Sequence, residues 1–305
     1  MTCLTFVRAC AKLGMLPEPT GRSTMTEIEM KAVDTEKRRG LSDLFQGYKW
    51  NYLPDAILDG YMGEAFVDDQ EHPQIAVLEA PKLKLSILGG NARHPSARTY
   101  IEELPVPRIV MFAAEGWEEL VREIHRGRLI RLPRYAFTSE KLDLAHLYDL
   151  KSQLPDGYRL ERMNINLAQK LASERSDFAA DHMLNFDSPE HFIARGFGFC
   201  VLEGDEVVSL GTTFAVCDKG IEIQIDTRKN HRGRGLATVV AAQLLIHSLE
   251  NNLDPNWDAA NKASVGLAKK LGYTPQGTYS MYVLVKSRFK AAFGKAILKL
   301  QERMQ

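Results

Sequence analysis

Residues 220–251 read GIEIQIDTRKNHRGRGLATVVAAQLLIHSLENN, and this stretch decides the predicted fold. Its first residues alternate strictly between isoleucine and polar side chains: Ile221, Glu222, Ile223, Gln224, Ile225 and Asp226. A period of two predicts a strand with one apolar and one polar face. From Leu236 the apolar spacing becomes helical, and a basic loop with Gly233 and Gly235 joins the two elements. This arrangement predicts a phosphate site, because free amides and the positive end of a helix dipole favour an anion.

The positions of the glycines limit which phosphate ligand the loop suits. A dinucleotide-binding turn needs a third glycine where this chain has Thr238, and the P-loop pattern G-x-x-x-x-G-K-[ST] occurs nowhere in the chain. The loop resembles the pyrophosphate loop of the GNAT acetyltransferases, Q/R-x-x-G-x-G/A, which binds coenzyme A. Gly233 and Gly235 fill the two glycine positions, whereas Asn230 departs from the usual glutamine or arginine. The alternative is an ordinary strand-to-helix turn without a ligand.

Other stretches extend the resemblance, and together they look like a two-domain bacterial branch of the GNAT N-acetyltransferases. The stretches are residues 63–73, 197–209, 220–238 and 257–273. The resemblance implies an α/β fold with a mixed (α+β) sheet in two tandem GNAT-like domains. The N-terminal domain would be degenerate, because GGNARHPSA at residues 89–97 stands where the second half has HRGRGLA. An unrelated α/β domain in the first half is the alternative.

The pattern of elements predicts four segments along the chain. They are a loose extension at residues 1–24, a degenerate GNAT-like domain at 25–150, the acetyltransferase domain at 151–285 and an amphipathic helix at 286–305. Whether Met1 or Met25 is the true start stays open. The role of the N-terminal domain is expected to be one wall of the substrate cleft or a contact in a homodimer.

The resemblance implies acetyl-CoA as co-substrate and assigns residues to it. Ile225 and Thr227 would border the pantetheine arm, and Asn261 would lie beside the cofactor. The pyrophosphate would be held by the loop and the start of the helix: Arg232, Gly233, Arg234, Gly235, Leu236 and Ala237. No metal is expected, because the four cysteines and eight histidines show no ligand spacing.

Acetyl transfer to a primary amine needs a base for the amine proton and a donor for the departing thiolate. Glu222 is the predicted base because it lies on a wholly polar strand face, although that face could equally be a solvated outer surface. Asp226 is the second candidate, unless it only caps the basic loop. Many GNAT enzymes use a tyrosine as the donor, where this chain has Ala268. Ser264 is therefore a candidate donor, together with Tyr279 and Tyr282.

Composition narrows the function classes further. Lysine plus arginine and aspartate plus glutamate each number 39, so a nucleic-acid partner is not expected, despite a cluster at Arg126, Arg128, Arg131 and Arg134. No apolar run is long enough to cross a membrane, and the cysteine usage suggests a cytoplasmic protein. The expected partner is a small-molecule or peptide amine. The alternative function is a non-catalytic sensor or scaffold that binds acyl-CoA, motivated by Ala268.

Overall fold

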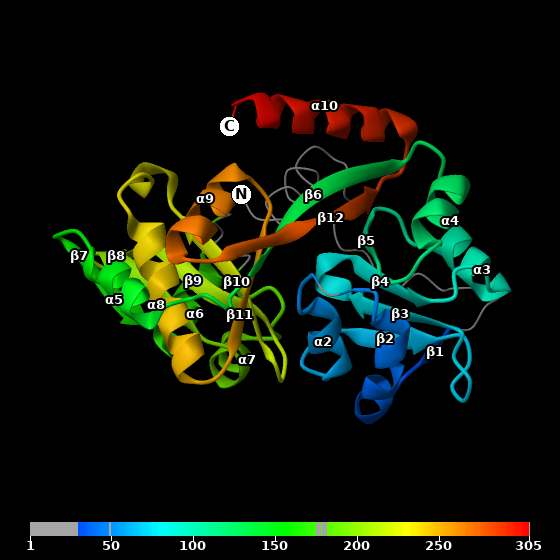
Figure 1. The fold of residues 1–305 in the computed structure, drawn as a ribbon, viewed down its shortest axis with the longest axis horizontal. Helices are drawn as coiled ribbons and strands as arrows, with labels where there is room; N and C mark the ends of the chain where they lie inside the picture. Colours follow the sequence, from blue (N-terminus) through cyan, green and yellow to red (C-terminus); the bar gives the residue numbers. More distant parts are fainter. Residues whose placement is uncertain (1–29, 49, 175–177, 179–181, 305) are drawn as a thin grey trace. The chain divides into compact units, whose positions relative to one another are not determined.

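The computed structural model describes residues 30–48, 50–174, 178 and 182–304 (Figure 1). The predictions for residues 1–24, and the choice between Met1 and Met25, lie outside these residues. The described chain divides into two compact units. Unit 1 contains residues 50–53 and 134–278, and unit 2 contains residues 30–48, 54–133 and 279–304. The predicted domain limits concern independent folding, which contacts alone do not test, so they stay predictions.

Unit 1 is a sheet with helices on both faces. Its strands follow the order β6-β11-β10-β9-β8-β7, and β10 runs parallel to β11 while its pairing with β9 is antiparallel. Their bounds are β6 (Leu129–Thr138, of which residues 134–138 belong here), β7 (Tyr158–Arg162), β8 (Gly198–Glu203), β9 (Glu206–Val216), β10 (Gly220–Thr227) and β11 (Asp254–Ala259). This is the mixed sheet that the family resemblance implied.

The helices of unit 1 cover the two faces through separate apolar clusters. One face packs on α5 (Leu144–Ser152), α8 (Leu236–Glu250) and α9 (Lys262–Leu271). The other packs on α6 (Ile165–Ser173) and α7 (Pro189–Arg195). Alternation along β8 produces this division, because Phe199 and Val201 belong to the first face while Cys200 and Leu202 belong to the second. In Figure 1, α5 and α8 lie beside each other over the strands.

The strand and the helix predicted from residues 220–251 are confirmed as β10 and α8. The possibility that the polar face of β10 is a solvated outer surface is wrong. The side chains of Glu222 and Gln224 are 6% and 3% exposed. Polar groups of neighbouring segments cover Glu222, because the backbone N–H of Tyr52 and the side chain of Asn256 both donate to it.

The strands of unit 2 follow the order β1-β2-β3-β4-β5-β12. Its core brings the helices over residues 95–103 and 117–124 against the sheet, around the fully buried Trp117. The strands are β1 (Lys31–Ala32), β2 (Glu64–Val67), β3 (Ile75–Ala80), β4 (Leu85–Gly90), β5 (Arg108–Phe112) and β12 (Thr274–Leu284, which starts in unit 1). The helices are η1 (Thr35–Phe45), α2 (Leu53–Leu58), η2 (Pro81–Leu83), α3 (Pro95–Glu103), α4 (Trp117–Ile124) and α10 (Arg288–Met304).

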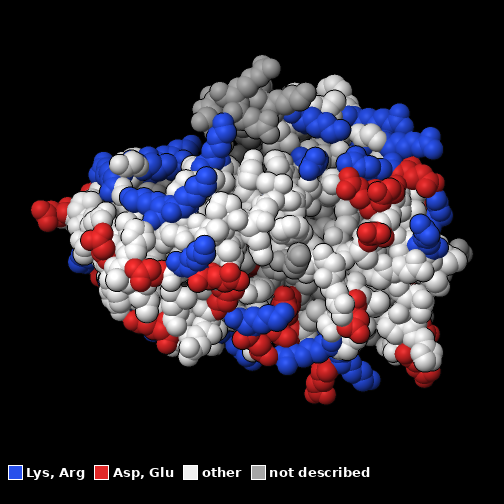
Figure 2. All heavy atoms as spheres, viewed as in Figure 1, with Lys and Arg blue, Asp and Glu red and all other residues white. Residues whose placement is uncertain are grey.

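Surface charge and α10 complete the description. Phe289 and Phe293 on α10 are exposed, while Ala291 is buried. The face drawn in Figure 2 carries both basic and acidic side chains. Among the helices of the described chain, none is long and apolar enough to span a bilayer. The described residues also contain no group of three or more His, Cys, Asp or Glu placed to hold a metal ion.

Candidate active site

The loop between β10 and α8 leaves a row of backbone amides at the start of a long helix. The chain leaves β10 at Thr227, makes one 3-10 turn (η3, Lys229–His231) and enters α8 at Leu236. The first amides of α8 that bond within the helix are those of Thr238 and Val239, both to the carbonyl of Gly235. Within the described residues, no protein acceptor takes the amides of residues 233–237. These amides and the dipole of a 15-residue helix suit an anion.

Two glycines in this loop have a left-handed backbone. Gly233 has φ +79° and Gly235 has φ +81°, and Gly235 is the N-cap of α8. A Cβ at either position would meet open space, so the conformation, and not crowding by the protein, is what requires glycine. The open space in front of both residues is also what a phosphate would occupy.

The arginines of the loop have different partners. Arg228 is committed to the protein, with its guanidinium 2.8 Å from Glu174 Oε1 and 3.2 Å from Glu206 Oε1. Arg232 donates to the carbonyl of Thr227 at 3.0 Å, and Arg234 donates to the hydroxyl of Tyr158 at 2.6 Å. Both of the latter residues are exposed beside the helix start. They therefore add positive charge at the place where the free amides converge.

Strands β10 and β11 are paired for only part of their length. The parallel ladder joins Gly220–Glu222 to Asp254–Asn256, whereas the ladder between β10 and β9 continues to Thr227. The register with β9 shifts between Glu222 and Ile223, as in a β-bulge. Beyond Glu222, the edge of β10 that faces β11 continues toward the glycine loop. Its residues there are not part of the ladder with β11. Such an edge can pair with an extended ligand.

Glu222 lies where the two strands separate. Its Oε1 accepts hydrogen bonds from the backbone N–H of Tyr52 at 2.5 Å and from Asn256 Nδ2 at 2.7 Å. Burial raises the pKa of Glu222 to about 8, against the lowering effect of the Tyr52 hydrogen bond. The charge of Asp258 raises this pKa further, while Asn256 and Arg134 lower it. A carboxyl with this pKa can gain and lose a proton near neutral pH.

Tyr52 is a site residue that the sequence did not reveal. It comes from the N-terminal half of the chain, yet residues 50–53 belong to unit 1. Its hydroxyl donates to Asp254 Oδ2, and the other oxygen of Asp254 accepts from the hydroxyl of Ser139. Burial, followed by the hydrogen bond to Asp254, raises the pKa of Tyr52. The aromatic run at Tyr48, Trp50 and Tyr52 is the one local signal that could have drawn notice.

A buried ion pair lies on the same sheet face. Arg134 on β6 and Asp258 on β11 approach to 2.8 Å, and their side chains are 9% and 7% exposed. The guanidinium Nε contacts both carboxylate oxygens at 3.0 Å. Arg134 is therefore a structural cation within unit 1. Of the other arginines in its sequence cluster, Arg128 donates to the carbonyl of Val285 and Arg131 to Ser280.

Asp226, on the polar side of β10, faces a buried histidine, His182. His182 Nδ1 lies 2.7 Å from Thr212 Oγ1, and its Nε2 lies 3.7 Å from Asp226 Oδ2. Among the described residues, His182 Nε2 and Gln224 Nε2 are buried without a hydrogen-bond partner. Asp226 thus contributes negative charge to a polar face that is already rich in carboxylates.

Ser264 and Asn261 lie on the opposite side of the sheet from Glu222. Asn261 caps α9, with its Oδ1 accepting from the amide of Ser264 at 3.0 Å. Trp257 packs among the helices of that side, and its Nε1 donates to Ser264 Oγ at 3.2 Å. Ala268, at the usual tyrosine position, is fully buried in the same cluster. The structure therefore brings Glu222 together with Tyr52 and not with Ser264.

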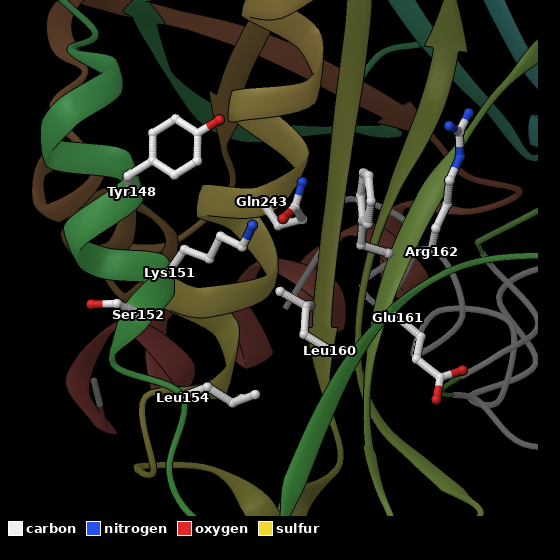
Figure 3. A pocket seen from close by; sticks show the side chains of 9 residues that line it. Tyr148, Lys151, Ser152, Leu154, Leu160, Glu161, Arg162 and Gln243 are labelled. Atoms are coloured by element: carbon white, nitrogen blue, oxygen red, sulfur yellow. The ribbon is translucent and has the colours of Figure 1, made fainter.

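Two remaining features are the predicted donor tyrosines and a surface depression. The tyrosines predicted as proton donors pack within unit 2, where Tyr279 lies edge-on to Tyr48 and Tyr282 joins the core. A shallow depression of about 590 Å³ lies between α5, α8 and the edge of the sheet (Figure 3). Its lining includes Tyr148, Lys151 and Gln243, and none of the predicted site residues.

Comparisons with known proteins show the family to which the chain belongs. The GNAT acetyltransferase family model matches residues 42–282. An N-acetyltransferase of Bacillus subtilis strain 168, YdfB, whose name marks it as uncharacterized, is 28% identical over 236 residues, which cover 74% of this chain and 88% of that protein.

Solved structures with a similar fold include further GNAT proteins. A GCN5-related N-acetyltransferase-like protein from Streptococcus suis 89/1591 is 29% identical, with a TM-score of 0.71, over 82% of this chain and 99% of that one. A tandem GNAT protein from the clavulanic acid biosynthesis pathway has a TM-score of 0.56 at 11% identity, over 86% of this chain and 99% of its own, which shows a shared fold. The chain therefore belongs to the GNAT acetyltransferase family and is an acyltransferase.

Proposed function

We propose that the protein moves the acetyl group of acetyl-CoA to a primary amine by direct attack, with Glu222 as the general base. The observation that supports this most directly is the place of Glu222, buried where β10 and β11 separate. A raised pKa of about 8 makes its carboxylate a stronger base than an exposed one. The amine is either a small molecule or a peptide.

The residues at the start of α8 fit the phosphates of the co-substrate. The free amides of residues 233–237 would hold the pyrophosphate, with Gly233 and Gly235 supplying the backbone conformation and Arg232 and Arg234 the charge. The free edge at Ile225–Thr227 would pair with the pantetheine arm. The amides of Leu236 and Ala237 belong to this row. Asn261, which caps α9, is proposed to border the cofactor.

Bound acetyl-CoA supplies the electrophile, a thioester carbonyl carbon. Glu222 takes the proton that the amine loses, and a backbone N–H on the free edge of β10 stabilises the developing negative oxygen. We propose Ser264 as the donor to the thiolate, which it would approach from the side of the sheet opposite Glu222; its oxygen accepts a hydrogen bond from Trp257. The carboxylates near this face, Glu222 and Asp226, favour a cationic amine.

The test is the pH dependence of thiol release in wild type and Glu222→Gln. Glutamine keeps the shape and both hydrogen bonds but cannot take a proton. We expect unchanged acetyl-CoA binding by thermal shift and turnover lower by ~10²–10⁴ at neutral pH. The loss should shrink as pH rises, because more of the amine is then already neutral. The exposed Glu140→Gln is the matched control. A near wild-type rate for Glu222→Gln would move the base to Asp226, with Asp226→Asn as the next variant.

A further inference from the structure

A four-residue segment from the N-terminal half is built into the unit that carries Glu222. Residues 50–53 precede α2 of unit 2 in the chain, but they pack within unit 1. Tyr52 is fixed there at two points, by its N–H on Glu222 and by its hydroxyl on Asp254. Trp50, two residues before Tyr52, accepts a hydrogen bond from Asn256 Nδ2 through its backbone carbonyl at 3.5 Å. The segment therefore has its own partners in the candidate site.

Asp254 is the anchor for this segment. Its two carboxylate oxygens accept from different hydroxyls, those of Tyr52 and Ser139. Its backbone is fixed as well, because it pairs with Gly220, where a Cβ would come within 2.0 Å of the Asp254 carbonyl oxygen. A rigid anchor at the ring end holds the backbone end of Tyr52 against the carboxyl of Glu222.

The hydrogen bond from Tyr52 matters chemically because it is made to the same carboxylate oxygen of Glu222 as a second hydrogen bond. Tyr52 N–H and Asn256 Nδ2 both bond Oε1 of Glu222. Two donors on one oxygen stabilise the ionised form of a buried carboxyl and leave Oε2 to receive a proton. Losing either donor would make the ionised form harder to reach.

We propose that Tyr52 is a positioning residue, which orients Glu222 and supports its ionisation through the backbone N–H that the hydroxyl–Asp254 anchor holds in place. This rests on the proposed role of Glu222 as base. The N-terminal half of the chain thereby supplies part of the machinery that the glycine loop alone would assign to the C-terminal half.

Other charged and titratable groups act on Glu222, and none of them is substituted in the variants below. Asp258 on β11 and Arg134 on β6 act on its carboxyl with opposite sign. Tyr273, which follows α9, is buried with its hydroxyl on the carbonyl of Pro255, and the charges of Asp254 and Glu222 contribute to raising its pKa. Because these groups are common to all variants below, a change in the pH profile reports on the Tyr52 anchor.

The test compares Tyr52→Phe with Tyr148→Phe in the full-length protein. Each variant loses one hydroxyl that donates to a carboxylate, but Tyr148 bonds Glu250 on the surface. We expect Tyr52→Phe to move the ascending limb of kcat against pH upward by about 0.5–1 unit and to lower kcat near pH 7 by about 3–10-fold. The KM for acetyl-CoA should stay within about twofold. Tyr148→Phe should match wild type.

Two further variants keep the inference falsifiable. Ser139→Ala weakens the anchor without touching Tyr52 and should shift the limb in the same direction by a smaller amount. Glu222→Gln should remove the part of the limb that reports the ionisation of Glu222 and leave only the rise that follows neutralisation of the amine. Suppose that Glu222→Gln changes the limb in this way but Tyr52→Phe leaves the midpoint of the limb where it is in wild type. Glu222 is then the base, but Tyr52 does not position it, even if kcat falls in Tyr52→Phe. If Glu222→Gln leaves the limb unchanged, the proposed base and the inference both fail.

Discussion

The burial of Glu222 has a measurable cost in stability that depends on pH. Its pKa is about 8 in the folded protein, while in an unfolded chain a glutamate has a pKa of ~4.3. At a pH below the pKa of the unfolded chain, Glu222 is protonated in both the folded and the unfolded state. The protonated side chain then makes its full contribution to the free energy of unfolding. As the pH rises through the folded value, that contribution is lost, because the unfolded chain releases its proton far earlier.

Replacing Glu222 with glutamine removes this dependence. The free energy of unfolding of Glu222→Gln, relative to wild type, should therefore rise by about 3–5 kcal/mol between about pH 4 and pH 9. The measurement is guanidinium denaturation of both proteins across that range, with the exposed Glu140→Gln as a control that should show no such trend. A difference that stays flat with pH would show that Glu222 is solvated and ionised like a surface carboxylate, and would refute the argument from burial.

Two further predictions concern the loop and the ion pair. Gly235→Ala should weaken coenzyme A binding at least about tenfold, measured by ligand-dependent thermal shift, and cost ~1–2 kcal/mol of backbone strain. Gly204→Ala, at another left-handed glycine with open space around it, should carry similar strain and bind normally; equal weakening in both would argue against the loop. Arg134→Leu should destabilise by about 3–5 kcal/mol in denaturation, because Asp258 is left buried without its cation. Adding Asp258→Leu should restore most of that loss, and a single-variant loss under about 1 kcal/mol would contradict it.

The features that the sequence predicted are those set by short-range pattern. Alternation, two left-handed glycines and an apolar run placed β10, the loop and α8 within residues 220–251. Asn261 also has a local explanation, since an asparagine before a helix is a common N-cap. The family resemblance added the ligand that this loop suits.

The surroundings of Glu222 could not be predicted in the same way. The residue that donates to its carboxyl, Tyr52, lies 170 positions earlier in the chain, and Arg134 lies 124 positions from Asp258. No local period links such residues, so the polar face of β10 looked equally suited to solvent and to a site. Whether a polar strand face is buried is decided by what packs against it, which a single sequence does not contain.

The noncontiguous make-up of unit 1 affects how the chain is synthesised and folded. Residues 50–53 leave the ribosome long before β10 exists, so the hydrogen bond from Tyr52 to Glu222 closes one of the longest loops in the molecule. Contacts so distant in sequence slow folding, and they keep the early segment without its partners until synthesis is far advanced. A fragment that began at residue 151 would also lack β6, whose residues 135–137 pair with β11, and would expose a strand edge prone to aggregation. The C-terminal half of the chain is therefore expected to need residues 50–53 and β6 in order to fold completely.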